Sequence, residues 1–330
     1  MASIPQSKNE TLKIPKIMLF LSFFILIAFT IFIVLHFTEA EKFAQLLSKA
    51  EPKWLVLAIV LQIGTYFCAG FIWNMVIRNA GHQLPLSILA RLSIEKLSID
   101  QLVPTGGMSG NLIVVRTMKR FGLPNWLAIE AVVIDIFSHY ITDMIMAVLA
   151  LSVLWFNHNI TNIVWYLVAI FTVIVIVVPT SIFWILTHRN GQLPSWLLRF
   201  KFITNISETV KMVSPERILL PNLLGGSTLL NMAIFVLDAC TLWAMLRITN
   251  YSTGILTALV AIVLATIAGA ISFLPGGMGG FEAGSVMALA LFEVPIEIAL
   301  TSTLLFRGFT LWIPLIPGVL MTRYDIKEKV

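Results

Sequence analysis

The residues that could do chemistry in this chain are a few ionisable side chains within long apolar segments. Arg307 lies in TSTLLFRGFTLWIPLIPG, Asp238 lies in NMAIFVLDACTLWAML, and Glu282 directly follows a glycine-rich stretch. An arginine at the centre of a bilayer costs about 2.5–3.5 kcal/mol even on the mildest scale, so it should face the protein interior and a partner. We expect that partner to be Glu282, Asp238 or a lipid phosphate.

Arg307 and Glu282 each have a structural interpretation beside a functional one. Arg307 follows Pro295 by about 18 Å of helix, at about 1.5 Å per residue, which places it near mid-bilayer. It either holds phosphate, with Gly308 leaving space beside the guanidinium, or it forms a structural ion pair. Glu282 is either a helix cap favoured by the helix dipole or a buried carboxylate that couples protons.

A third group of ionisable residues recurs at a spacing of four. Asp135, His139 and Asp143 share one helical face in an otherwise apolar stretch. Such a face indicates a cavity lining or a proton path, and equally a surface packed against the charged helix expected over 86–103. The histidines are scattered, and the sequence contains no HExxH, CxxC or GxSxG motif. We therefore expect no catalytic residue, no metal and no cofactor.

Two glycine-rich stretches repeat one pattern, PTGGMSGN over 104–111 and PGGMGGFE over 275–282. Non-helical backbone at membrane depth survives only beside protein or a wet cavity. Glycine lets the backbone approach a ligand closely, and a helix that begins there presents its positive end to an anion such as phosphate. The alternative is that these glycines only allow tight helix packing. The glycines expected to line a substrate path are Gly106, Gly107, Gly276, Gly277, Gly279 and Gly280.

Composition places these residues in a membrane. Of the 330 residues, 58% are hydrophobic and only 12% are charged, whereas a soluble domain has about 25% charged residues. The net charge of +5 is assigned to basic cytoplasmic loops rather than to nucleic-acid binding. The chain is thus expected to be an all-α polytopic membrane protein.

The whole chain, 1–330, is expected to form a single integral membrane domain. Its parts are a first span at 17–37, a first repeat over 54–156, a span at 163–187, a cytoplasmic linker over 188–217 and a second repeat over 218–322. About 20 apolar residues cross a bilayer, and the sequence has such runs at 17–37, 54–77, 125–156, 163–187, 218–246, 254–273 and 295–322.

Loop charge predicts the orientation of these spans. Basic residues gather before the first span, in the middle linker and after the last span, so both termini and the linker are expected to be cytoplasmic. The first glycine break is then entered from the cytoplasm and the second from outside. The two halves would be inverted repeats, each with a Gly-broken re-entrant helix pair, which is a transporter architecture.

LPGGMGGFEAGSVMALALF followed by ALTSTLLFRGFTLWIPLIPG resembles the membrane region of the lysylphosphatidylglycerol synthases, the flippase-like domain family. The matching residues are Pro275, Gly276, Gly277, Gly279, Glu282, Arg307 and Gly308. The resemblance implies lipid translocation between leaflets, without lysyl transfer, because no soluble synthetase domain follows in this chain. The family pattern of an acidic–Arg pair on the first-half helix is replaced here by Asp135-Ile136 and then His139.

These observations favour a flippase-like transporter in a prokaryotic plasma membrane. It would move an anionic phospholipid, glycolipid or polyprenyl-phosphate headgroup past Arg307, with Glu282, Asp238 and Asp135 tuning charge or coupling protons. The alternatives are a non-catalytic subunit or enzyme of lipid-linked sugar metabolism, and a small-solute carrier. The expected partners are membrane lipid headgroups and no nucleic acid, with a homodimer or a lipid-modifying enzyme partner left open.

Overall fold

Apolar runs of the sequence form long helices in the computed structural model. The structure describes residues 51–102, 108–157, 161–187, 215–272 and 274–327, all within one unit that covers residues 49–330. The predicted first span at 17–37, most of the predicted linker at 188–217, and Gly106 and Gly107 lie outside the described residues.

The first half places a pair of shorter helices between long apolar ones. Its elements are α2 (Pro52–Asn79), α3 (Leu86–Leu102), α4 (Met108–Arg120), α5 (Asn125–Phe156) and α6 (Asn162–Thr187). Both α2 and α4 are followed by a glycine with positive φ, Gly81 at 79° and Gly122 at 82°. Glycine is the residue that most easily adopts this conformation after the last helical turn, so the sequence itself ends these helices.

The second half repeats this order and adds an interruption near its end. Its elements are α9 (Pro215–Ile218), α10 (Pro221–Ile248), α11 (Ile255–Ser272), the 3-10 turn η1 (Pro275–Gly277), α12 (Gly280–Ala290), α13 (Ile296–Arg307), the π-helical segment η2 (Gly308–Trp312) and α14 (Ile313–Lys327). The predicted span 295–322 is therefore one helical run with a π-helical segment inside it. Such segments are rare and occur frequently at functional sites.

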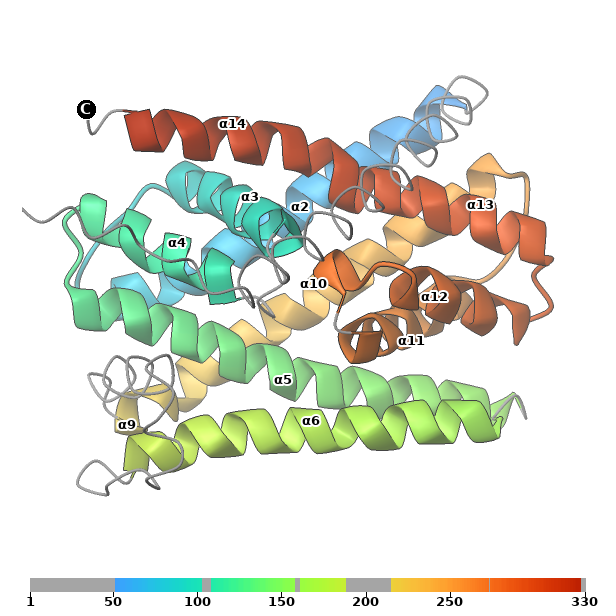
Figure 1. The fold of residues 1–330 in the computed structure, drawn as a ribbon, viewed down its shortest axis with the longest axis horizontal. Coiled ribbons are helices and arrows are strands. Elements are labelled where there is room, and N and C mark those ends of the chain that lie inside the picture. The colour runs from blue at the N-terminus through green and yellow to red at the C-terminus, as the bar shows by residue number, and fades with distance from the viewer. Residues whose placement is uncertain (1–50, 103–107, 158–160, 188–214, 273, 328–330) are drawn as a thin grey trace, which may run out of the picture. The chain divides into compact units, whose positions relative to one another are not determined.

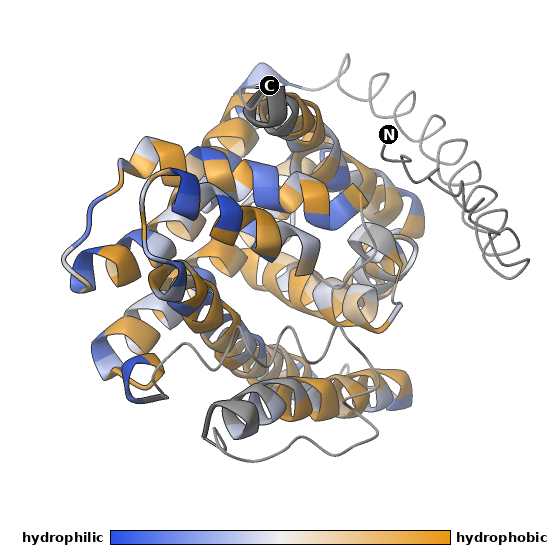
Figure 2. Ribbon diagram, turned by 60° about the vertical axis from the view of Figure 1, so that its left-hand side comes forward, coloured by the Kyte–Doolittle hydropathy of each residue, from blue (hydrophilic) through white to orange (hydrophobic). Residues whose placement is uncertain are grey.

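Within the described residues, six helical stretches are long and apolar enough to cross a membrane. They are α2, α5, part of α6, α10, α11, and the α13–η2–α14 run. Hydrophobic residues make up much of these helices (Figure 2), and many of the large ones are exposed, including Phe156 at 81% and Tyr166 at 70%. Large exposed apolar side chains over so much surface are characteristic of contact with lipid. The chain is an all-α multi-pass membrane protein, as the sequence predicts.

The core of the first half lies between α2, α3, α4 and α5. Trp73, Leu89, Met118 and Leu127 are each at most 1% exposed and belong to one apolar cluster. Helix α10 joins the two halves, since it packs against α2, α5 and α11. The last helix, α14, returns across the molecule and packs against α3.

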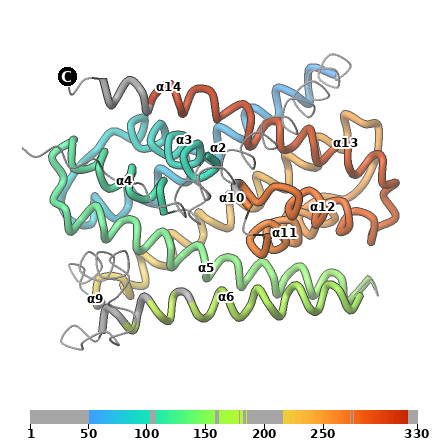
Figure 3. Tube along the Cα trace, in the orientation of Figure 1, coloured from blue at the N-terminus to red at the C-terminus, as the bar shows by residue number. Residues whose placement is uncertain are grey.

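The two glycine-rich segments each connect a packed pair of helices. α3 packs against α4, and α11 packs against α12. Figure 1 shows the α3–α4 pair in its left half and the α11–α12 pair in its right half, and the path between them can be followed in Figure 3. The C-terminal part of α3 contacts η1, so the glycine-rich segment of one pair lies beside the end of the other.

Candidate functional site

The second glycine-rich segment forms a turn that favours glycine at three positions. Gly276, Gly277 and Gly279 have φ values of 59°, 68° and 73°, a region that L side chains rarely adopt. Gly277 also lies against α11, where an added Cβ would stand 3.1 Å from the Cα atom of Gly269. The backbone therefore breaks where the sequence predicts a break.

Gly280 has a different role, which is close helix packing. A Cβ atom at this position would stand 2.6 Å from the carbonyl oxygen of Ala268. One turn later, a Cβ at Gly284 would stand 3.0 Å from the carbonyl oxygen of Leu264. For Gly280 the packing interpretation is the observed one, and the three preceding glycines shape the turn.

Arg307, the last residue of α13, ties this turn to α12. Its Nε donates a hydrogen bond to Oε1 of Glu282 at 2.7 Å, and its Nη2 donates to the carbonyl oxygen of Gly276, also at 2.7 Å. The guanidinium carbon lies 4.9 Å from the centre of the Phe281 ring. Arg307 is only 8% exposed, as predicted for a membrane arginine. Of its two predicted partners within the chain, Glu282 is the one that the structure brings to it, and the lipid phosphate stays a prediction.

Glu282 lies in the first turn of α12, where the helix dipole favours a carboxylate. Its Oε1 accepts the hydrogen bond from Arg307, whereas its Oε2 is buried without a hydrogen-bond partner within the described chain. A buried carboxylate oxygen left unpaired costs more than an ordinary hydrogen bond contributes. Glu282 therefore retains one acceptor for a ligand donor or a water molecule.

Gln101, a residue that sequence reasoning missed, also lies at this turn and contacts the π-helical segment η2. Gln101, near the end of α3, donates a long hydrogen bond of 3.4 Å from Nε2 to the carbonyl oxygen of Thr310 in η2. A Cβ added to Gly276 would stand 3.7 Å from Cγ of Gln101 and 3.7 Å from Nη2 of Arg307. The only signal for Gln101 in the sequence is its position, a polar residue three positions before Pro104, where the first glycine-rich stretch begins.

Gln101, Gly276, Glu282, Arg307 and Thr310 are referred to below as the central cluster. They come from α3, η1, α12, α13 and η2, so both halves of the chain contribute. The buried Oε1 of Gln101, like Oε2 of Glu282, has no hydrogen-bond partner among the described residues. The cluster combines one cation, one carboxylate, a neutral amide and backbone carbonyls, a set of groups that can form ion pairs and hydrogen bonds with a polar ligand.

The first glycine-rich segment is described only from Met108 onward. Gly110, which corresponds in the repeat to Gly280, also packs against the preceding helix, because its N–H donates to Oδ1 of Asp100 at 2.8 Å. A Cβ at Gly110 would stand 2.5 Å from that oxygen. Burial raises the pKa of the Asp100 carboxyl, while Lys96, the Gly110 N–H and the hydrogen bond from Lys96 lower it.

Asp238 is not the partner of Arg307, so that part of the prediction is wrong. It accepts a hydrogen bond of 2.9 Å from Nε2 of Gln62 in α2. The same nitrogen lies 3.1 Å from Oγ1 of Thr241. A neutral amide on the adjacent helix thus supplies the hydrogen bond that a buried carboxylate requires, and Asp238 belongs to the α2–α10 contact rather than to the central cluster.

The polar face of α5 contacts two neighbouring helices, α2 and α10. Asp135 accepts a hydrogen bond of 3.3 Å from the indole Nε1 of Trp73 in α2. His139 is half-exposed, and its Nε2 lies 3.7 Å from Oδ2 of the buried Asp143. On the same face, Ser138 accepts a hydrogen bond of 2.9 Å from Asn231 of α10. The predicted shared face exists, and these contacts place it outside the central cluster.

Among the described residues, no group of three or more His, Cys, Asp or Glu side chains is positioned to hold a metal ion. The central cluster brings together three of the predicted site residues, Arg307, Glu282 and Gly276. Gly277, Gly279 and Gly280 shape or pack the same turn.

Comparison with known proteins shows the family of this chain. The family described as the lysylphosphatidylglycerol synthase TM region matches residues 19–318, which include both glycine-rich segments and Arg307. The UPF0104 membrane protein MJ1595 of Methanocaldococcus jannaschii is 22% identical over 333 aligned positions, which cover 95% of this chain and 96% of that protein. Because the family match covers most of the chain, the protein belongs to the lysylphosphatidylglycerol synthase transmembrane-region family.

Proposed function

We propose that this protein is a flippase-like transporter, and not an enzyme, that moves the headgroup of an anionic phospholipid, glycolipid or polyprenyl-phosphate across the prokaryotic plasma membrane. The observation that supports this is the central cluster, where the end of α3 and the broken segment η1 meet. Transporters built from inverted repeats place substrate where broken helices meet near the midplane. The membrane lipid context of the family agrees with such a substrate.

Arg307 is the group that would hold the phosphate. A guanidinium binds carboxylate and phosphate with the same forked geometry, so an incoming phosphate competes with Glu282 for the same nitrogen atoms. Glu282 alone would repel an anion at the N-terminus of α12, but its ion pair with Arg307 removes that charge. We propose that the Arg307–Glu282 pair fills the site between transport cycles and opens when a headgroup enters.

The burial of the Glu282–Arg307 ion pair is a second argument for a functional role of this site. A buried ion pair gains little net stability, because the two charges lose their hydration. Its retention in an apolar environment therefore favours a functional role over a purely stabilising one. The non-catalytic subunit and small-solute carrier remain alternatives, and each predicts a different result in the following experiment.

The test is transport of a fluorescent phosphatidylglycerol in proteoliposomes, read as the fraction of label that a membrane-impermeant reductant reaches over time. The variant Glu282→Gln with Arg307→Gln removes both charges and leaves no uncompensated charge. We expect the parent protein to move the lipid and the double variant to lose transport. A control with Lys53→Gln, whose exposed partner is Glu51, should match the parent.

Three other results would overturn the proposal. Equal transport by the double variant would remove the central cluster from the mechanism. No transport by the parent in the presence of a membrane potential and a pH gradient would favour the subunit alternative. Uptake of water-soluble phosphate esters without lipid movement would favour the small-solute carrier.

A further inference from the structure

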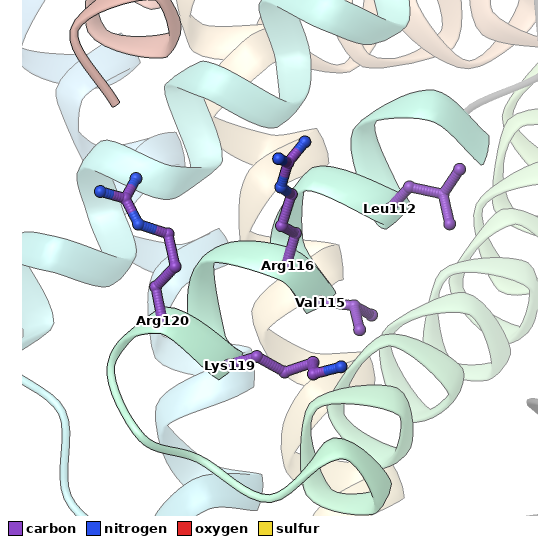
Figure 4. A pocket seen from close by; sticks show the side chains of 5 residues that line it. All are labelled: Leu112, Val115, Arg116, Lys119 and Arg120. Carbon is purple, nitrogen blue, oxygen red and sulfur yellow. The ribbon is translucent and has the colours of Figure 1, made fainter. Parts of the chain in front are cut away.

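Helix α4 borders an open hollow whose lining includes no residue of the central cluster. The hollow has a volume of about 370 Å³ and is lined by Leu112, Val115, Arg116, Lys119 and Arg120. Figure 4 shows that all five side chains come from the one helix, with the three basic chains along its last two turns. One apolar and one cationic zone thus border the same space.

The basic side chains of this hollow face outward. Arg116 and Lys119 are exposed, and neither forms an ion pair with a carboxylate in the part of the chain that the structure describes. Leu112 is 67% exposed and Phe121 51% exposed on the same helix and just after it. Long basic side chains beside exposed apolar ones are the composition of a membrane–water interface.

The position of these residues along α4 agrees with that interface. At about 1.5 Å per residue, Arg116 lies about 12 Å and Arg120 about 18 Å along the helix from Met108. The hydrocarbon half of a bilayer is about 15 Å thick. If the glycine break lies near the midplane, as predicted, the long side chains of these cations reach the lipid phosphates of one leaflet, the one predicted to be cytoplasmic.

The corresponding helix of the second half lacks this feature. Helix α12 has the sequence GFEAGSVMALA, in which Glu282 is the only charged residue. The repeat therefore does not require a basic helix at this place, and the charge belongs to the first half alone. The basic side chains of α4 thus have no counterpart on α12.

We propose that the α4 hollow is a binding site for the headgroup of an anionic phospholipid of that leaflet. Arg116 and Lys119 bind the phosphate, and the lipid chains lie against Leu112 and Val115. This inference rests on the proposed function in one respect, since it makes the hollow the place where substrate waits before it reaches the central cluster. The binding itself does not depend on transport.

The test is native mass spectrometry of the full chain in detergent, titrated with phosphatidylglycerol and separately with phosphatidylcholine. We expect Lys119→Gln and Arg116→Gln each to weaken phosphatidylglycerol binding about tenfold, the effect of losing one charge-assisted hydrogen bond. The matched control is Arg78→Gln, an exposed cation in the last turn of α2, which should change binding less than about twofold. Phosphatidylcholine binding should be weaker and insensitive to all three substitutions.

Each other outcome has a definite meaning. Equal loss in Lys119→Gln and Arg78→Gln would show diffuse surface attraction, of the kind that any basic loop provides, and would overturn the site. The site would also be overturned if free glycerol phosphate displaced phosphatidylglycerol at concentrations similar to those of the lipid. The lipid chains would then contribute nothing to binding. Loss of lipid binding in Lys119→Gln, with no transport by the parent, would support this site and contradict only the proposed transport.

Discussion

The α3–α4 and α11–α12 pairs each consist of two packed helices joined by a glycine-rich segment, but the charges of their carboxylates are balanced differently. In the first pair, the charge of Asp100 is balanced within the pair, because Lys96 lies 3.4 Å from its carboxylate, which also accepts the Gly110 N–H. In the second pair, the charge of Glu282 is balanced by Arg307 from α13. The carboxylate of Asp100 is thus balanced inside its own pair, whereas the carboxylate of Glu282 depends on a neighbouring helix.

This difference indicates where movement could be transmitted. Arg307 holds both the α12 carboxylate and the η1 carbonyl oxygen of Gly276, and it directly precedes the π-helical segment. A shift of α13 would therefore move the turn and the helix together. The first pair is connected to the same run through Ser98, whose hydroxyl donates to the carbonyl oxygen of Pro314 at 3.0 Å. The α13–α14 run thus contacts both pairs.

The largest expected effect is from Arg307→Ala. This substitution leaves Glu282 buried without its partner, which typically costs about 3–5 kcal/mol. The measurement is the loss of stability in detergent, followed by heating or denaturant. In the Arg307→Ala background, Glu282→Gln should restore part of the loss, because it removes the uncompensated charge.

The matched control for that experiment is Lys53→Ala. Lys53 pairs with Glu51 at the start of α2, where both side chains are exposed, and such pairs contribute about 0–1 kcal/mol. If Arg307→Ala is no more destabilising than Lys53→Ala, the second pair does not depend on its neighbour and the comparison fails.

Gly280→Ala should be the next most damaging substitution, and it should exceed Gly110→Ala. At Gly280 the new methyl group meets the backbone oxygen of Ala268, which cannot move without shifting α11. At Gly110 it meets the carboxylate of Asp100, which can rotate away. Overpacking costs about 1–3 kcal/mol, and we expect Gly280 near the upper end and Gly110 near the lower end, measured by the same unfolding assay. Equal costs would show that the two helix pairs pack alike.

Sequence reasoning located the helices well because their signals are local. The apolar runs, the prolines that precede α5 and α13, and the two glycine patterns each act within a few residues, so element boundaries agree to within a few positions. It also required Arg307 to have a partner, because charge in an apolar segment demands one. The identity of that partner depends on packing, so three candidates remained and Asp238 was a wrong one.

The rest of the central cluster could not be predicted because its signals are not local. The bond between Gln101 and the carbonyl oxygen of Thr310 joins residues 209 positions apart. The π-helical segment has no residue pattern that distinguishes it from the α-helix on either side. Asp238 is satisfied by the neutral Gln62, and a search of the sequence for opposite charges does not find such a partner.

A smaller effect is expected from Gly279→Ala, which tests the turn alone. Gly279 has a φ of 73° and open space where a Cβ would be, so only the backbone strain of about 1–2 kcal/mol is added. The control is Gly225→Ala in α10, which also has open space but no positive φ. That substitution should stabilise the helix by about 0.5–1 kcal/mol. Opposite signs of the two changes in unfolding free energy would confirm that the turn needs glycine, and the same sign would contradict it.

The smallest expected effect is from Lys96→Gln in the first pair. Lys96 and Asp100 are partly exposed, with side-chain exposures of 27% and 17%, and an i,i+4 pair contributes about 0.2–0.5 kcal/mol. A double-mutant cycle with Asp100→Asn measures this coupling, and high salt should weaken it because the pair is partly solvated. A coupling above about 1 kcal/mol that salt does not change would exceed the range for such pairs. The first pair would then also rely on an ion pair for its stability, and dependence on a buried charge would no longer distinguish the two halves.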